Sequence, residues 1–241
     1  MKPAAILLTT FHKHEHLIDA CIESLDYTWP EHPQVIVLSD RGRFQHSQKI
    51  LTDSTSWTCI LQQGISESIA QGLLSPEDSI LLLLEDHVPL SPLPLERLAM
   101  AFETMTEYKL PYLALFGHGK SSVFKEGPER IYERAADYRF YSELHPALWR
   151  VAYLKEMTKL AIRDERHSAW EFETQAGQAN HYTTDSLWTS ELGGFLAEGR
   201  VDWGMLRKMK AAEFRKLRRK LRYKAIRALP RRVCQRILRK S

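Results

Sequence analysis

The fold class of this chain follows from the stretch Ser79-Ile80-Leu81-Leu82-Leu83-Leu84-Glu85-Asp86-His87. A short, unbroken apolar run is typical of a strand that is buried on both faces of a sheet. Two acids and an imidazole follow the run directly, and in open α/β sheets ligands bind just beyond the carboxyl ends of such strands. Adjacent carboxylates repel each other unless a cation or a proton lies between them. The stretch therefore predicts a buried central strand followed by a site for a divalent ion and phosphate oxygens.

The segments on either side of this strand alternate between strand and helix patterns. Strands are expected at residues 4–10, 34–40, 57–62 and 111–116. Helices are expected at residues 14–27, 43–51, 65–74, 93–108 and 150–162. Residues 121–133 are polar and are expected to form a loop or a hairpin. Alternating strands and helices indicate βαβ units, so we expect an α/β fold with a mostly parallel central sheet flanked by helices.

The charge of the chain is distributed very unevenly. The 241 residues have a net charge of +4, but residues 206–241 contain 16 Lys and Arg and one acid, whereas residues 1–205 contain 18 Lys and Arg and 29 acids. We therefore expect one large domain over 1–205 and a basic amphipathic helical tail over 206–241. A tail of this kind binds polyanions, and we expect it to lie on an anionic membrane surface. The alternatives are a solvated helix docked on the acidic body and a nucleic-acid contact.

The sequence also excludes several classes of protein. Cys21, Cys59 and Cys234 are few and far apart, which fits a reducing cytosol and not a disulfide framework. No apolar run approaches the roughly 20 residues that span a bilayer, and the apolar start is too short for a signal peptide. The patterns GxGxxG and GxxxxGK[ST] are absent, which excludes a Rossmann dehydrogenase and a P-loop enzyme.

Polar residues follow the first two expected strands. Thr9, Thr10 and Phe11 end the first strand, where they can line a nucleotide pocket. Asp40 ends the second strand and can accept a hydrogen bond from a ribose hydroxyl or a base N–H, the alternative being a turn or N-cap acid. His12, His14 and His16 alternate along the next segment, but they lack the HExxH order of a zinc site.

Two later segments contain further candidates. In Ser168-Ala169-Trp170-Glu171-Phe172-Glu173, the spacing of Ser168 and Glu171 predicts a capping box, which would account for Glu171 structurally. The alternative is that Glu171 or Glu173, which point to different sides of a helix, acts as a general base. In His145-Pro146-Ala147-Leu148-Trp149-Arg150, Trp149 can stack on a sugar and Arg150 can hold a phosphate. Here the alternative is a core tryptophan and a surface arginine.

Together these segments resemble the GT-A glycosyltransferases, the nucleotide-diphospho-sugar transferase superfamily. The resemblance extends from residue 4 to about residue 200 and includes the opening strand and helix, Asp40, and the acidic motif Leu84-Glu85-Asp86. The 145–150 and 168–173 segments resemble uncharacterised bacterial glycosyltransferase-like proteins linked with surface polysaccharide or lipopolysaccharide synthesis. The Trp-Glu-Phe-Glu run at 170–173 is the more specific part of this likeness.

The resemblance implies a function and a set of site residues. The nucleotide-sugar donor would be bound by Thr9, Thr10, Phe11, Asp40, Glu85 and Asp86. Mg²⁺ or Mn²⁺ would bind at Asp86, and His87 stands where the family's DxD motif has its second acid, so it is either a ligand or part of a site that works without metal. Glu171 or Glu173 would deprotonate the acceptor, which would be contacted by His145, Trp149, Arg150 and Trp170.

The implied acceptor is a glycan or a lipid-linked molecule, and the expected location is the cytoplasm, at the inner face of the membrane. The donor base, the sugar and the stereochemical course stay open. The competing hypotheses are a catalytically inactive GT-A-like scaffold at the membrane and a nucleic-acid-binding protein that acts through its tail. Against nucleic acid, the aromatic and basic residues are not interleaved as in a known RNA module.

Overall fold

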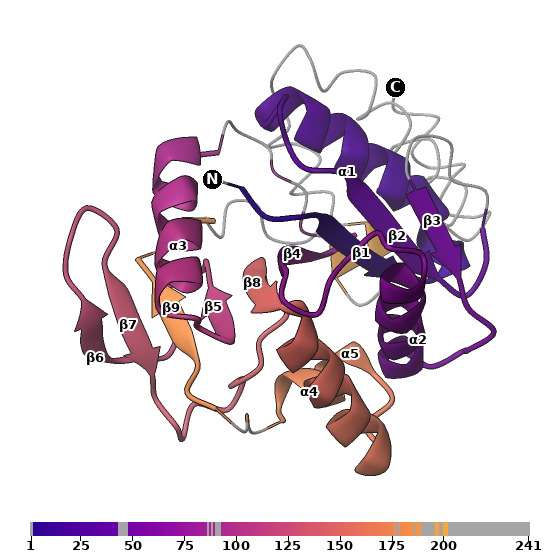
Figure 1. The fold of residues 1–241 in the computed structure, drawn as a ribbon. Coiled ribbons are helices and arrows are strands. Elements are labelled where there is room, and N and C mark those ends of the chain that lie inside the picture. Colours follow the sequence, from indigo (N-terminus) through magenta and orange to yellow (C-terminus); the bar gives the residue numbers. More distant parts are fainter. Residues whose placement is uncertain are drawn as a thin grey trace, which may run out of the picture.

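A nine-stranded sheet runs through the centre of the computed structural model, in the order β3-β2-β1-β4-β8-β5-β9-β7-β6 (Figure 1). The structure describes residues 2–42, 48–85, 87, 89, 93–175, 177, 179–185, 187–188, 196–197 and 200–201. Asp86 and the basic tail expected over 206–241 lie outside these residues. Among the described residues, no helix combines the length and the apolar character needed to cross a membrane.

The strands of the large sheet are β1 (Ile6–Thr10), β2 (Val35–Ser39), β3 (Gln48–Leu51), β4 (Ser79–Leu84), β5 (Tyr112–Ala114), β6 (Lys120–Lys125), β7 (Ile131–Arg134), β8 (Ala147–Arg150) and β9 (Tyr182–Thr184). A separate short pair consists of β10 (Leu196–Ala197) and β11 (Arg200–Val201). The helices are η1 (His12–His14), α1 (Glu15–Thr28), α2 (Trp57–Ala70), α3 (Leu95–Glu107), α4 (Val151–Arg163) and α5 (Ala169–Glu173).

The sheet is covered by helices on both faces because its strands alternate apolar side chains between two cores. Ile6 and Leu8 of β1 pack in one core with the apolar faces of α1 and α3. Leu7 of β1 packs in the other core with α2, α4 and α5. The helix α2 lies so close to β2 that a Cβ added at Gly64 would be 2.7 Å from the methyl carbons of Leu38. The expected α/β fold, with helices on each side of a central sheet, is confirmed.

The sheet has a parallel half and a mixed half. The strands β3, β2, β1 and β4 are all parallel, with Ile6 of β1 opposite Val35 of β2 and Leu81 of β4. The strand β8 then runs antiparallel between β4 and β5. The hairpin of β6 and β7 forms the far edge of the sheet, so of the loop or hairpin expected at 121–133 the hairpin is the one found.

Two sequence-based element predictions were wrong. Residues 57–62, expected as a strand, form the first turns of α2, because Trp57, Ile60, Leu61 and Ile65 repeat with helical spacing on its buried face. The β-branched and aromatic residues at the start of this segment favoured a strand locally, and the tertiary packing overrode that preference. Residues 48–51, expected in a helix, form β3, which pairs with β2 at the sheet edge. The remainder of that expected helix, residues 43–47, lies outside the described residues.

Candidate functional site

The order of the parallel strands creates a ligand position at one edge of the sheet. The chain moves outward from β1 to β2 and β3, and then returns to place β4 on the other side of β1. Neighbouring connections therefore leave β1 and β4 in opposite directions, and ligands of open α/β sheets bind at such a switch point, outside the carboxyl ends of the strands. We call the edge where β1, β2 and β4 end the carboxyl edge.

At the carboxyl edge, the end of β1 is connected to the end of β2 through His12 and Asp40. The backbone N–H of His12 donates to Oδ1 of Asp40 at 2.7 Å, and Nδ1 of His12 lies 2.6 Å from Oδ2 of Asp40. Burial alone would raise the pKa of Asp40, but the hydrogen bonds from the backbone and ring of His12 outweigh it and lower that pKa. Both oxygens of Asp40 thus contact His12, whose side chain is 37% exposed.

A second pair connects the loop after β1 to the end of β4. Nδ1 of His14 contacts Oε1 of Glu85, the residue that follows β4. Since η1 supplies both His12 and His14, this single turn bridges the ends of three strands. The predicted residues Asp40 and Glu85 therefore lie at one edge, each paired with a histidine.

The row of histidines continues beyond β4. His87 is buried, and its ring stacks on that of His145 with a centroid distance of 5.0 Å. His145 reaches the carboxyl edge because β8 begins there, antiparallel to β4, with Ala147 opposite Leu82. Burial, reinforced by the nearby His145, lowers the pKa of His87 to about 3. The ring of Phe116, which follows β5, packs on His145 at 4.4 Å.

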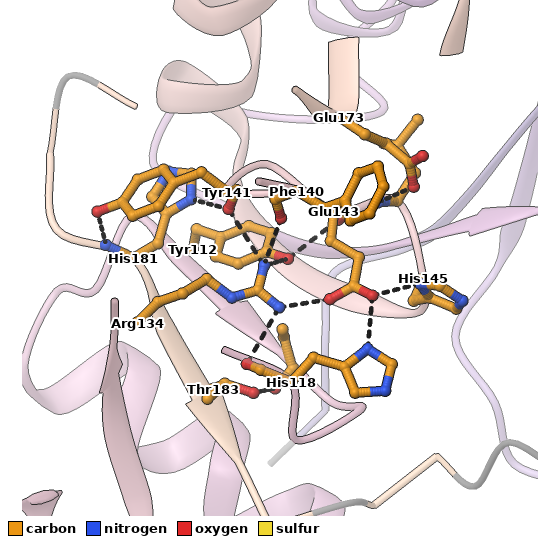
Figure 2. A network of polar contacts seen from close by, with 12 residues as sticks. Tyr112, His118, Arg134, Phe140, Tyr141, Glu143, His145, Glu173, His181 and Thr183 are labelled. Carbon is orange, nitrogen blue, oxygen red and sulfur yellow. Dashed lines mark hydrogen bonds and ion pairs between the residues drawn. The ribbon is translucent and has the colours of Figure 1, made fainter. Parts of the chain in front are cut away.

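A buried ion pair lies next to this row (Figure 2). The guanidinium of Arg134 donates from Nη2 to Oε2 of Glu143, and from Nη1 to the hydroxyl of Tyr112 at 3.0 Å. The other oxygen of Glu143, Oε1, faces Nδ1 of His118 at 2.8 Å and Nδ1 of His145 at 2.5 Å. Burial would raise the pKa of Glu143, but the hydrogen bond from His145 and the charge of Arg134 dominate and lower it to about 2.

A cavity of about 670 Å³ lies beside the end of β1. It is lined by Phe11 and by the first residues of α2 and α5, including Ser56, Trp57, Ser168 and Glu171. Ligand pockets in proteins commonly measure about 300–1,000 Å³. The structure thus brings Phe11 and Glu171, both predicted as site residues, to one cavity.

The expected capping box is present at the start of α5. The hydroxyl of Ser168 accepts from the backbone N–H of Glu171 at 3.2 Å, and Oε2 of Glu171 accepts from the backbone N–H of Ser168 at 2.9 Å. These bonds to Ser168 lower the pKa of Glu171, which makes it a weaker base. Glu173 lies on another side of α5, where its Oε1 accepts from the backbone N–H of Leu144 at 2.9 Å.

The remaining predicted residues have different surroundings. Trp149 is fully buried in the core, so its indole offers no face to a sugar, and the core alternative describes it correctly. Arg150 does not lie at the carboxyl edge. It lies opposite Ser79, where β4 begins, and its Nη2 pairs with Oε2 of Glu77 at 2.9 Å. Trp170 is 59% exposed and packs edge-on against Phe140.

Thr9 and Thr10 lie at the end of β1 as predicted, and both are buried. Within the described part of the chain, Oγ1 of Thr9 has no hydrogen-bond partner. Thr10 donates its hydroxyl proton to the backbone oxygen of Phe11 at 3.3 Å.

Sequence reasoning missed His118, Arg134 and Glu143. His118 follows a strand within Gly117-His118-Gly119, so its position after β5 was a usable signal for the carboxyl edge. Arg134 and Glu143 lie in segments without regular periodicity. No local pattern identified their pairing, which depends on tertiary structure.

No family model and no curated protein match this chain. Among solved structures, it is similar to a 4-diphosphocytidyl-2C-methyl-D-erythritol synthase, with a TM-score of 0.45, 14% identity, and coverage of 74% of this chain and 90% of that one. It is also similar to S. aureus TarS, with a TM-score of 0.42 and 14% identity, over 82% of this chain and 41% of TarS. A third match is an active-site mutant of LgtC, with a TM-score of 0.38 and 9% identity, over 70% and 68% of the two chains.

Because the identities are 9–14% and the TM-scores 0.38–0.45, the likeness is one of general fold, and no site residue is assigned from it.

Proposed function

We propose that this protein is a glycosyltransferase that moves a sugar from a nucleoside-diphosphate donor to an acceptor hydroxyl. The observation that best supports this proposal is the switch point between β1 and β4, where Asp40 and Glu85 gather with His12 and His14 at the ends of three parallel strands. A switch point of this kind is where open α/β sheets bind their ligands, nucleotides among them.

The donor would lie across the carboxyl edge. Its nucleoside would contact the segment from Phe11 to His12, which follows the buried end of β1. Arg41, whose Nε lies 3.7 Å from Oδ2 of Asp40, is an exposed cation beside this segment and can face a diphosphate. Asp40 would act by holding His12 rather than by contacting the ribose itself, because both of its oxygens contact His12.

In the transfer, the acceptor oxygen would form a bond to the anomeric carbon while the bond from that carbon to the diphosphate oxygen breaks. The acceptor proton would pass to a carboxylate. Of the two predicted bases we favour Glu173, because the carboxylate of Glu171 is used by the capping box and its pKa is lowered. The cavity beside Phe11 is lined by Glu171 and not by Glu173, so it supports a ligand position at the start of α5 but not the choice of Glu173.

A divalent ion remains part of the proposal, since Mg²⁺ or Mn²⁺ neutralises a diphosphate leaving group when bound beside it. Its predicted ligands are Asp86 and His87. His87 provides an imidazole, a ligand that suits Mn²⁺ better than Mg²⁺ because Mg²⁺ prefers oxygen. We also propose, from the sequence alone, a glycan or lipid-linked acceptor and contact of the tail at 206–241 with an anionic membrane surface, which would place the protein at the inner face of the membrane.

Donor turnover tests the proposal. The full-length protein is incubated with a glycan acceptor and with UDP-, GDP-, dTDP- and CDP-sugars in the presence of Mn²⁺, and loss of the anomeric proton signal of each donor is followed by NMR. We expect one donor class to be consumed, and Glu173→Gln to lower the rate at least about 100-fold, as for loss of a general base.

The matched control is Glu77→Gln, a change of the same chemistry at the opposite edge of the sheet, which should leave the rate unchanged. Consumption of none of these donors would contradict the proposed transfer and favour the scaffold or the nucleic-acid-binding hypothesis. If both variants have the same rate, Glu173 is not the base.

A further inference from the structure

Three potential metal ligands come together from two segments that are distant in sequence. His118 follows β5, whereas Glu143 and His145 precede β8. These segments meet because β5 and β8 pair antiparallel, with Ala114 opposite Ala147, and because the backbone N–H of Leu115 donates to the oxygen of Pro146 at 3.0 Å. One ligand atom from each of His118, Glu143 and His145 lies within 4.8 Å of the others.

The carboxylate of Glu143 is held in a fixed position. Its Oε2 contacts Arg134, whose side chain is fully buried and also donates to the backbone oxygens of Phe140 at 3.2 Å and Tyr141 at 3.1 Å (Figure 2). Arg134 therefore leaves only Oε1 to face the two imidazoles. Hydrogen bonds to the second oxygen of a metal-binding carboxylate are the usual way in which proteins orient such a ligand.

The surroundings of the cluster suit an ion with open coordination positions. Glu143 is 3% exposed, whereas the side chains of His118 and His145 are 44% and 35% exposed. An ion bound to all three would therefore face protein on one side and solvent on the other. The ring of Phe116 packs against both imidazoles and limits their movement. Its centroid lies 5.3 Å from that of His118 and 4.4 Å from that of His145.

We propose that His118, Glu143 and His145 form a binding site for a divalent first-row transition-metal ion, with the remaining positions filled by water or by oxygens of a ligand. Two imidazoles and one carboxylate are suitable ligands for Zn²⁺, Co²⁺, Fe²⁺ or Mn²⁺, whereas Mg²⁺ and Ca²⁺ require mostly oxygen ligands. The site differs from the one predicted at Asp86 and His87. It does not depend on the proposed function, because it concerns only an ion and these three side chains.

Binding of Co²⁺ to the full-length, untagged and metal-stripped protein tests this site. Co²⁺ is added with isothermal titration calorimetry and visible absorption as readouts. In Asp86→Ala, which lacks the ion predicted at Asp86 and His87, we expect one Co²⁺ per chain, which a large excess of Mg²⁺ does not displace. His118→Gln and His145→Gln should each weaken binding at least tenfold. The control is His32→Gln, which removes a histidine paired with Asp26 on another part of the surface and should leave Co²⁺ binding unchanged.

Circular dichroism is used to check that each variant is folded. Both target imidazoles are partly exposed, so neither variant should unfold. If one of the variants does unfold, X-ray absorption on the unaltered protein still tests the site. X-ray absorption of the Co²⁺-loaded chain should show imidazole scattering from two histidines. The site is disproved by an oxygen-only shell, by no binding to the folded protein, or by equal affinity in the His118 and His145 variants and the unaltered chain.

Discussion

The ring of His12 and the carboxylate of Asp40 lie 2.6 Å apart and connect the ends of β1 and β2. A similar pair, His32 and Asp26, joins two residues near the end of α1 at 3.0 Å. The first pair lies at the switch point of the sheet, and the second lies away from it. Comparison of the two pairs therefore shows whether nucleotide binding depends on an acid–histidine contact at the switch point in particular.

Asp40→Asn should weaken nucleotide binding at least tenfold, because it removes the charge that holds His12 at the carboxyl edge. Titration calorimetry with the nucleotide that binds the unaltered protein is the measurement. Asp26→Asn is the matched control and should bind as the unaltered protein does. Equal affinities in the two variants would mean that the His12–Asp40 pair does not form part of the nucleotide site.

The capping box at the start of α5 allows a test of whether Glu171 stabilises the helix or acts as the general base. Ser168→Ala removes the side chain that caps α5 and should lower the free energy of unfolding by about 1 kcal/mol, measured by urea denaturation. Glu171→Gln keeps the shape of the side chain and should have a smaller effect on stability. Donor turnover by Glu171→Gln should fall less than tenfold. A loss of 100-fold or more would identify Glu171, and not Glu173, as the base.

Loss of either partner of the buried ion pair of Arg134 and Glu143 should destabilise the protein strongly. Arg134→Met leaves the buried carboxylate of Glu143 without its cation, and loss of one partner of a buried pair costs about 3–5 kcal/mol. Arg130→Met, which removes an exposed arginine paired with Glu126 four residues earlier, should have no measurable effect. Chemical denaturation of both variants compares the two positions. Similar unfolding free energies would show that the carboxylate of Glu143 does not require the guanidinium of Arg134 in the folded protein.

His181 should make the protein less stable in mild acid. Burial lowers its pKa from 6.5 to about 3, because its ring is enclosed by Tyr112, Tyr141 and Tyr153. Between these two values the unfolded chain binds a proton that the folded chain does not, so stability falls as the pH decreases through 6.5 toward 3. From pH 7 to pH 5 this single group should lower the free energy of unfolding by about 2 kcal/mol.

The check on His181 is the change in unfolding free energy between pH 7 and pH 5, compared in the unaltered protein and in His181→Gln. The variant starts from a lower stability, because it loses hydrogen bonds to Tyr141 and Tyr153, but its loss between the two pH values should be smaller. An identical loss in both proteins would show that His181 titrates normally.

The strands β1, β2 and β4 of the parallel half were predictable from the sequence because their signals are local, whereas β3 was expected to be helical. The apolar run at Ser79–Leu84 indicated β4, and polar residues at strand ends indicated Asp40 and Glu85. The antiparallel placement of β8 between β4 and β5 was not predictable, because strand order depends on contacts between distant segments. The strand expected at 57–62 failed for the same reason, since packing against β2 determines that this segment is helical.

The site was predicted less completely than the fold. A sequence pattern places a residue near a strand end but does not reveal its partner, so the contacts of His12 with Asp40 and of His14 with Glu85 were not foreseen. Trp149 and Arg150 were chosen for their chemistry, yet β8 runs away from the carboxyl edge and places one in the core and the other at the opposite edge.

The central claim is that the carboxyl edge binds a sugar nucleotide, and thermal unfolding of the full-length protein tests it most directly. UDP, GDP, CMP and dTDP are added in turn, with and without Mn²⁺, since a ligand that binds only the folded state raises the unfolding temperature. The account predicts an increase with one nucleotide that is larger with Mn²⁺, smaller in Asp40→Asn and in Asp86→Ala, and unchanged in Asp26→Asn. No increase with any nucleotide, or an equal increase in all three variants, would contradict it.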